Sequence, residues 1–414
     1  RVGRHLLGLT LPVLAIWAVV AVAVHSVLPM AWLGSLVLLL GWLGIDALPD
    51  LGLETYLLRF NERPALLYSD FQGYGALLGL HQWLTLYWAL LAGILLILTY
   101  VFWPYTHRLG WLARWQQSRR QCNRWLVSIV VLLGAAFLTL GYFLRQAEHN
   151  RSLPPDAAAL AAFRQKAVAY QALQPPQIIA VELNLDLYPQ EARFVAEGHY
   201  IVVNEGDRPI DSILIRSSYD ELTTLHWDRP SQLLSQDQPT RHQLYQLAPA
   251  LEPKDTAKLF FSIQSRPNLL LERQSVVLDN GSFLREDILP ILGNSLDTLR
   301  HLTDPKARQR HFYRPDAHRV SIQTTVTTDL DQQALAPGTL LRQDTTPEGR
   351  HRFVYKTLTP VKFQASFHSG RYASCQAGPV VLWHHPKHQQ HHDALLSGAQ
   401  TSLAWNGQRW GATP

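Results

Sequence analysis

The feature that most constrains the fold of this chain is a set of long stretches without a formal charge. Residues 6–45, 71–106 and 126–144 hold no Asp, Glu, Lys or Arg. A bilayer core about 30 Å thick needs roughly 20 apolar residues in a helix. Residues 6–45 are long enough for two such helices, with His25 and Pro29 marking the turn. The sequence therefore predicts about four transmembrane helices, over residues 6–24, 27–45, 84–103 and 126–144.

Buried helices of a large soluble protein are the weaker alternative, because so many apolar runs within the first 145 residues would leave little surface for water. The loops between the runs differ in charge. The first, residues 46–70, holds more acids than arginines, whereas the loop after Trp103 holds arginines and no acid: Arg108, Arg114, Arg119, Arg120 and Arg124. Short cytoplasmic loops carry an excess of Lys and Arg. We therefore expect an integral protein of a bacterial inner membrane whose C-terminal domain is extracytoplasmic.

Beyond Pro176 the apolar residues alternate with polar ones in short runs that Pro, Gly and Asp turns separate. The alternating positions are Val181, Leu183, Leu185 and Leu187, then Ala257, Leu259, Phe261 and Ile263, then Val320, Ile322, Thr324 and Val326. A period of two predicts antiparallel sheets with one face buried, arranged as a saddle or sandwich. The predicted fold class is thus multi-domain α + β. Its parts are the helical region 1–150, a linker helix within 151–175, an all-β domain 176–383, and the start of a further domain in 384–414.

Several functions are excluded by missing motifs. The sequence has no G-x-x-x-x-G-K-[ST] phosphate loop, no G-x-S-x-G nucleophile elbow and no H-E-x-x-H zinc helix. The net charge of +5 is spread along the chain without a basic cluster among aromatics, which argues against nucleic acid as a partner. The cysteines, Cys122 and Cys375, form no disulfide framework or zinc ribbon.

One group of histidines stands out: His384, His385, His388, His391 and His392, followed by Asp393. Imidazoles three and four residues apart on a helix can hold Zn²⁺, but Pro386 interrupts this run. We therefore expect a solvated loop that enters a helix near Asp393. The scattered His301, His311, His318 and His351 are expected to be surface or sheet residues. The sequence assigns no catalytic, cofactor-binding or metal-binding residue. The polar segment 69–75 is interpreted as a tight outer loop, with a substrate-facing element as the alternative.

With these residues in place, the chain resembles fused membrane proteins in which an ABC transporter permease runs into an aminopeptidase of the aminopeptidase N family. The resemblance follows the order of several segments along nearly the whole chain. They are YSDFQGYG at 68–75, VELNLDLYPQEARFVAEGHYIVVN at 181–204, NGSF at 280–283 with ILP at 288–290, LTDP at 302–305, APG at 336–338 and YKTLTP at 355–360.

The resemblance implies a membrane-anchored portion of a zinc aminopeptidase-like protein, with an N-terminal saddle domain that covers the active-site cleft. It implies zinc only in a catalytic domain following Pro414, where G-x-M-E-N and H-E-x-x-H motifs would lie. Soluble relatives carry F-P-x-x-D-E-P where this chain has ILPILG at 288–293. No catalytic or zinc-binding residue can therefore be carried over, and the chain is expected to be non-catalytic. Implied partners are the lipid bilayer, an ABC ATPase subunit and, with a catalytic domain, a peptide. The alternatives are a permease whose β-domain serves recognition, and a remnant without function.

Overall fold

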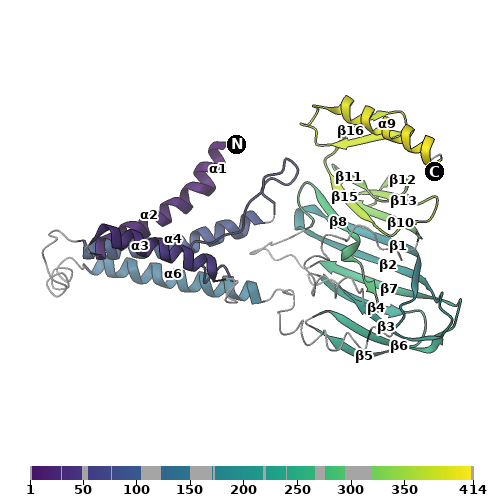
Figure 1. The fold of residues 1–414 in the computed structure, drawn as a ribbon, viewed down its shortest axis with the longest axis horizontal. Coiled ribbons are helices and arrows are strands. Elements are labelled where there is room, and N and C mark those ends of the chain that lie inside the picture. The colour runs from purple at the N-terminus through teal and green to yellow at the C-terminus, as the bar shows by residue number, and fades with distance from the viewer. Residues whose placement is uncertain are drawn as a thin grey trace. The chain divides into compact units, whose positions relative to one another are not determined.

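A computed structural model describes residues 2–28, 30–48, 55–75, 77–103, 123–149, 170, 173–217, 221–238, 240–265, 276–293 and 319–411. It divides into two compact units (Figure 1). The helical unit comprises Arg1–Leu67 and Tyr74–Arg151 as its main parts. The β unit comprises Tyr68–Gly73, Ser152–Pro267 and Ser275–Pro414. The short segment Tyr68–Gly73 thus belongs to the β unit although helices precede and follow it in sequence.

The described part of the helical unit is built from apolar helices. They are α1 Val2–His5, a π-helical turn Leu6–Thr10, α2 Leu11–Val27, α3 Ala31–Ala47, α4 Leu77–Phe102 and α6 Arg124–His149. Among the described residues, three helical stretches are long and apolar enough to cross a membrane: Leu6–Val27, Leu77–Val101 and Arg124–Gln146. The helix α3 is apolar but shorter. The break after α2 falls at the predicted turn, and α4 begins seven residues before the predicted third span, because residues 77–83 are also mostly apolar.

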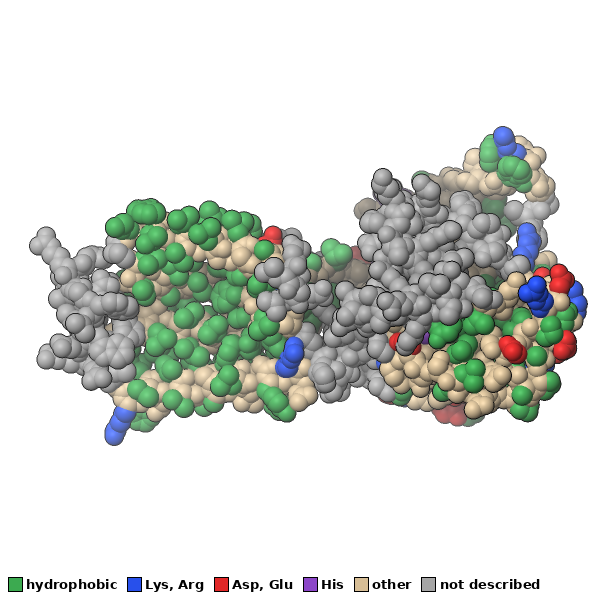
Figure 2. All heavy atoms as spheres, turned by 60° about the horizontal axis from the view of Figure 1, so that its bottom comes forward, with side chains coloured by type: hydrophobic (Ala, Val, Ile, Leu, Met, Phe, Trp, Pro, Cys, Tyr) green, Lys and Arg blue, Asp and Glu red, His purple; other side chains and the backbone are tan. Residues whose placement is uncertain are grey.

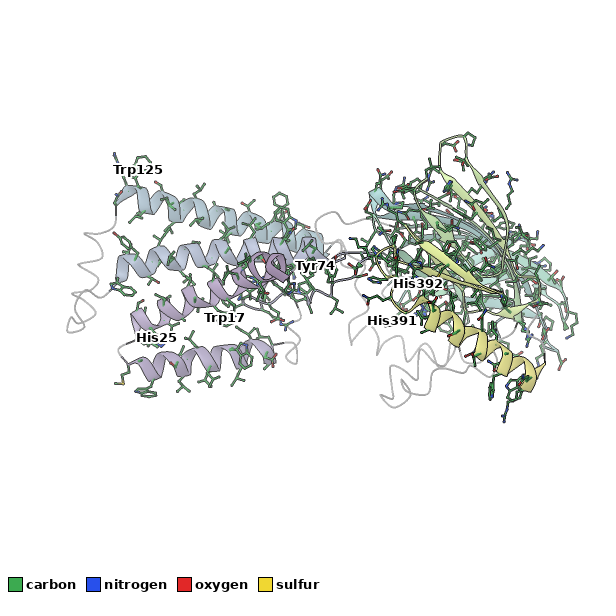
Figure 3. All side chains as sticks on the ribbon, turned by 90° about the horizontal axis from the view of Figure 1, so that it is seen from above. Trp17, His25, Tyr74, Trp125, His391 and His392 are labelled. Carbon is green, nitrogen blue, oxygen red and sulfur yellow. The ribbon has the colours of Figure 1, made fainter. Side chains whose placement is uncertain are left out.

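An aromatic seam holds these helices together. The ring of Tyr87 on α4 stacks on Phe137 of α6 at 4.3 Å between centroids, and Trp88 lies edge-on to Phe60 at 4.9 Å. The opposite faces of the helices are apolar and exposed, as at Leu132 (69 %) and Leu138 (70 %). Figure 2 shows hydrophobic side chains spread over this unit, and Figure 3 labels Trp17, His25 and Trp125 on its helices. An apolar surface of this extent is typical of a membrane or protein contact.

The β unit is a set of sheets followed by one helix. The strands are β1 Gln177–Tyr188, β2 Arg193–Val203, β3 Ile210–Arg216, β4 Glu221–Trp227, β5 Ser231–Asp237, β6 His242–Leu251, β7 Thr256–Ser265, β8 Ser282–Arg285, β9 Ile291–Leu292, β10 Arg319–Thr328, β11 Gln333–Leu335, β12 Thr339–Thr345, β13 His351–Lys356, β14 Val361–Lys362, β15 Ser366–Gly370, β16 Ala373–Ala377 and β17 Val380–His384; α9 spans His392–Trp410.

The largest sheet has the order β12-β13-β10-β1-β2-β7-β4, with β14 also paired to β10. Its central pair differs from the prediction of purely antiparallel sheets. Strands β1 and β10 run parallel, with Leu183 opposite Thr324, whereas β1 and β2 form an antiparallel hairpin. Parallel neighbours need a long crossover connection, and here more than 100 residues separate the two strands. The two alternating runs were recognised, but their relative direction was predicted wrongly.

Alternation in the sequence explains how the core forms. Along β1, Val181, Leu183, Leu185 and Leu187 are all at most 2 % exposed, and Glu182 and Asn184 between them face outward. A second sheet, β5-β6-β3-β9, contributes Ile213 and Ile215 of β3 to the same core. The fully buried Tyr200 of β2 donates its hydroxyl hydrogen bond to the carbonyl of Pro290 at 3.1 Å. The smaller sheet β11-β15-β8 contributes Ala334, Phe367 and Leu284 to this core, and the hairpin β16-β17 forms a separate two-stranded sheet.

The predicted linker helix, residues 151–175, lies outside the described residues except for Tyr170 and residues 173–175. Tyr170 is helical and residues 173–176 have no regular structure. Cys122 also lies outside the described residues, as do the arginines of the arginine-rich loop apart from Arg124.

Candidate functional site

The segment Tyr68–Gly73 packs against three parts of the β unit. The ring of Phe71 lies 5.0 Å from that of Tyr372, 4.9 Å from that of His385 and 6.3 Å from that of Phe283, measured between centroids. Burial raises the pKa of the Tyr372 hydroxyl to about 12, as expected for a phenol in apolar surroundings. Segment 69–75 was predicted to be a tight loop, and it contains one: the amide of Ser69 donates to the carbonyl of Gly73 at 2.7 Å.

The close approach of this segment depends on Gly281. The side-chain amide of Gln72 donates to the Gly281 carbonyl at 2.6 Å. A Cβ on Gly281 would lie 2.9 Å from the Cβ of Phe71, and the φ of +89° at this position is one that side chains rarely adopt. Gln72 and Gly281 both lie in segments that carry the sequence resemblance, and 209 residues separate them.

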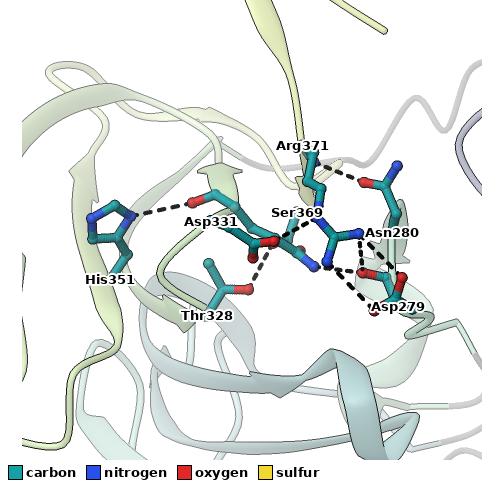
Figure 4. A network of polar contacts seen from close by, with 8 residues as sticks. Asp279, Asn280, Thr328, Asp331, His351, Ser369 and Arg371 are labelled. Atoms are coloured by element: carbon teal, nitrogen blue, oxygen red, sulfur yellow. Dashed lines mark hydrogen bonds and ion pairs between the residues drawn. The ribbon is translucent and has the colours of Figure 1, made fainter. Parts of the chain in front are cut away.

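A polar network supports the turn that contains Gly281 (Figure 4). Arg371 donates from Nε to Asp331 Oδ2 at 2.5 Å and from Nη1 to Asp279 Oδ2 at 3.1 Å. Its backbone amide donates to Asn280 Oδ1 at 2.8 Å. Hydrogen bonds to Asp279 and Asp331 raise the pKa of the Arg371 guanidinium above its usual value. The arginine therefore remains charged and ties three segments of the β unit together.

The network continues through side chains that are buried. Ser369 donates from Oγ to Gln332 Oε1 at 2.7 Å and lies 2.8 Å from Thr328 Oγ1. The amide of Gln332 in turn donates to the Asp279 carbonyl at 2.8 Å. His351, predicted to be a surface or sheet histidine, lies on β13 with Nδ1 3.4 Å from the Gln332 carbonyl. His301, His311 and His318 lie outside the described residues.

The histidines that the sequence singled out divide into two groups. His385 is buried at 8 % exposure and faces Phe71, and His388 Nε2 lies 2.7 Å from Asp70 Oδ2. His384 and His392 form the second group, and their ring centroids lie 4.0 Å apart. The predicted helix near Asp393 is present as α9, which begins at His392. Residues 386–391 form an exposed stretch, as expected for a solvated loop, but the predicted loop is shorter at its start, because His384 ends strand β17 and His385 is buried.

The second group includes a residue that the sequence did not connect to it. Cys375 of β16 lies with His384 and His392 so that the three ligand atoms are all within 4.8 Å of one another. His384 and His392, with His391 and Asp393, also line an open pocket of about 610 Å³. Figure 3 places His391 and His392 at the start of α9. A thiol and two imidazoles are ligands that transition metals prefer.

Comparisons with known proteins give a partial match by structure. Similar solved structures include an M1 zinc metallopeptidase from Deinococcus radiodurans, with 13 % identity and a TM-score of 0.39, over 58 % of this chain and 55 % of that enzyme. A point mutant of that metallopeptidase aligns over the same shares with 14 % identity and a TM-score of 0.37. The chain thus matches these enzymes over about half of their length. The sequence matches no protein-family model and no curated protein.

Proposed function

We propose that this chain is the membrane-anchored, non-catalytic portion of a zinc aminopeptidase-like protein fused to an ABC transporter permease. In this proposal the apolar helices are permease spans and the β unit is the saddle domain that covers a peptidase active site. The lipid bilayer is then the partner of the helices, and an ABC ATPase subunit and a peptide are the further partners.

The observation that carries the proposal is the hydrogen bond from Gln72 to the Gly281 carbonyl, at 2.6 Å. Two segments of the resemblance, YSDFQGYG and NGSF, meet there. The first lies between apolar helices in sequence, and the second leads into β8, an edge strand of the sheet β11-β15-β8. The contact needs glycine at position 281, because Phe71 and Gln72 occupy the space that a Cβ there would fill. This dependence of one segment on the other is a reason for the two segments to occur in one chain.

The helical unit supports the membrane part of the proposal. The apolar window within Arg124–Gln146 has none of its residues buried. In water such a surface would be costly, at about 25 cal/mol for each Å² of exposed apolar area. Hydrocarbon removes this cost, and the helix satisfies its own backbone hydrogen bonds.

The test compares two proteins in detergent micelles. One is the 414-residue chain, and the other is the product of the complete reading frame that encodes it. We expect no hydrolysis of aminoacyl-anilides by the first, because amide hydrolysis in this class needs a zinc-bound water and a general base. We expect chelator-sensitive hydrolysis by the second. Chelator-sensitive turnover by the 414-residue chain would refute its non-catalytic role. An inactive product of the complete reading frame without an H-E-x-x-H motif would favour a permease with a recognition domain.

A further inference from the structure

We propose that Cys375, His384 and His392 form a binding site for a zinc ion on one face of the β16-β17 hairpin. The site does not depend on the peptidase proposal, because it uses residues of this chain alone. Its ligands are a thiolate and two imidazoles.

The hairpin register brings two of the ligands onto one face. Cys375 is paired with Leu382, and His384 with Ala373, in an antiparallel ladder. Residues directly opposite each other point to the same side of a sheet, as do residues two apart on one strand. Cys375 and His384 therefore share a face, and the start of α9 brings His392 to it.

The ligand separations are compatible with zinc after a small adjustment. Zinc lies about 2.3 Å from sulfur and about 2.0–2.1 Å from nitrogen, so the ligand atoms of a tetrahedral site with one sulfur and two nitrogens are about 3.3–3.6 Å apart. The three ligand atoms lie within 4.8 Å of one another. A shift of at most about 1.5 Å closes that difference, and the three side chains are each partly exposed.

The second ring nitrogen of each histidine already has a backbone acceptor. Nδ1 of His384 lies 2.9 Å from the His385 carbonyl, and Nε2 of His392 lies 2.5 Å from the His388 carbonyl. A metal-bound histidine commonly donates its other N–H to a carbonyl or carboxylate, which fixes the tautomer and the ring orientation. These contacts leave Nε2 of His384 and Nδ1 of His392 as acceptors for a cation. This pair of contacts is the observation that distinguishes the site from a chance cluster.

The surroundings give the ion an entry path and a further ligand position. The pocket of about 610 Å³ is open and lined by His384 and His392, with Gln389 and Asp393 beside them. Three protein ligands with one position for water are typical of zinc sites that remain accessible. Cys375 is a free thiol among the described residues, so it can bind as a thiolate.

The experiment uses the full chain without a polyhistidine tag, stripped of metal and held in detergent. Zn²⁺ is titrated against a chromophoric chelator, and Co²⁺ is added separately as a spectroscopic probe. We expect one equivalent of zinc and a thiolate-to-cobalt charge-transfer band. Cys375→Ser should abolish that band and weaken zinc binding at least 100-fold. His384→Ala and His392→Ala should each weaken it at least 10-fold, since even outer-shell changes cost 10–100-fold.

His388→Ala is the matched control, because it removes a neighbouring histidine but keeps the backbone carbonyl that faces His392. It should leave zinc affinity unchanged. Equal weakening by His388→Ala and His392→Ala would show adventitious binding by a histidine-rich loop and overturn the proposal. So would a Cys375→Ser protein that binds zinc like the parent, or a parent that takes Cu²⁺ but not Zn²⁺.

A second measurement avoids variants that fail to fold. Zinc should slow alkylation of Cys375 by a maleimide at least 10-fold in the unaltered protein, because only the free thiolate is the nucleophile. An alkylation rate that zinc does not change would also overturn the proposal.

Discussion

The carboxylate of Asp70 lies with Oδ2 2.7 Å from Nε2 of His388, although 318 residues separate them in sequence. The His388 side chain is 58 % exposed, and an exposed ion pair contributes only about 0–1 kcal/mol to stability. The adjacent Phe71 makes ring contacts with Tyr372 and His385. The packing of Phe71 therefore holds this segment in the β unit more strongly than the Asp70–His388 contact does.

Substituting Phe71 and Asp70 one at a time separates their contributions to the stability of the β unit. We expect Phe71→Ala to lower the free energy of unfolding of the β unit by about 1–3 kcal/mol, less than a fully buried phenylalanine because the ring is partly exposed. Asp70→Asn should lower it by less than about 1 kcal/mol. Urea unfolding of the full chain in micelles, followed by near-UV circular dichroism, measures both. A larger loss for Asp70→Asn than for Phe71→Ala would contradict the ranking.

The buried part of the Arg371 network supplies a second prediction. Ser369 is 0 % exposed and its hydroxyl bridges Gln332 and Thr328. Ser369→Ala leaves the Gln332 oxygen without this donor, which costs about 1–3 kcal/mol. Gln376→Ala, an exposed position on β16, is the control and should change stability by less than about 0.5 kcal/mol. Equal effects of the two substitutions in urea unfolding would show that the bridge contributes nothing.

The sequence predicted most of this architecture because the strongest signals are local. Uncharged runs placed the apolar helices, and alternation from Val181 to Leu187 placed β1 and its buried face. The parallel pairing of β1 with β10 was missed because strand direction depends on the crossover between them, which no local pattern encodes.

The cluster of Cys375, His384 and His392 could not be predicted from the spacing of these residues in the sequence, for a similar reason. His384 and His385 are adjacent in sequence, yet one turns to Cys375 and the other to Phe71. The alternation of side chains in a strand separates neighbours onto opposite faces. The sequence did contain a signal, because Cys375 and His384 lie on either side of a turn. Predicting that they share a face requires the strand register, in which Ala373 pairs with His384.

A glycine within the largest sheet supplies a third prediction. Gly198 of β2 is paired with Leu183 of β1, and a Cβ at position 198 would overlap the backbone carbonyl of Glu182. Because backbone cannot move aside as a side chain can, Gly198→Ala should destabilise the β unit by about 1–3 kcal/mol. Glu197→Ala, an exposed neighbour on the same strand, is the control. A midpoint of urea unfolding unchanged by Gly198→Ala would show that the strands can separate at no cost.

Stability should depend on pH through His242. Burial, followed by the charge of Arg216, lowers the pKa of His242 to about 4, whereas Asp237 and the Thr240 backbone act in the opposite direction. The unfolded chain binds this proton near pH 6.5 and the folded chain only near pH 4. The unfolded state thus binds more protons between these values, so stability falls as pH drops from 6.5 to 4, by on the order of 3 kcal/mol.

Replacing the histidine isolates this contribution from other titrating groups. His242→Gln cannot take up the proton, so its stability should vary less with pH across this window than that of the parent chain. The difference between the two proteins, measured by urea unfolding at about pH 3.5, 5 and 7.5, which bracket the two pKa values, should grow as the pH rises. Parallel pH profiles would mean that His242 takes up its proton at the same pH in the folded and unfolded states.

The orientation of the chain gives a prediction for its cysteines. The loop that contains Cys122 also holds five arginines, Arg108, Arg114, Arg119, Arg120 and Arg124, and no acid. A charged residue at mid-membrane costs about 2.5–3.5 kcal/mol on insertion scales, so these arginines favour the cytoplasmic side. The helix α6 then leads to the outer side, where Cys375 would lie. We expect the two thiols to be on opposite sides of the membrane and unable to form a disulfide.

Labelling of intact cells with a membrane-impermeant maleimide tests this orientation. Cys375→Ser and Cys122→Ser variants report each thiol separately, and a chelator is present so that bound metal does not protect Cys375. Cys375 is partly exposed and should be labelled in intact cells, whereas Cys122 should be labelled only after the membrane is permeabilised. Protease added to spheroplasts should cut the β unit. Labelling of Cys122 in intact cells, with the β unit protected from protease, would mean that the arginine-rich loop faces outward and that the domain after α6 is cytoplasmic.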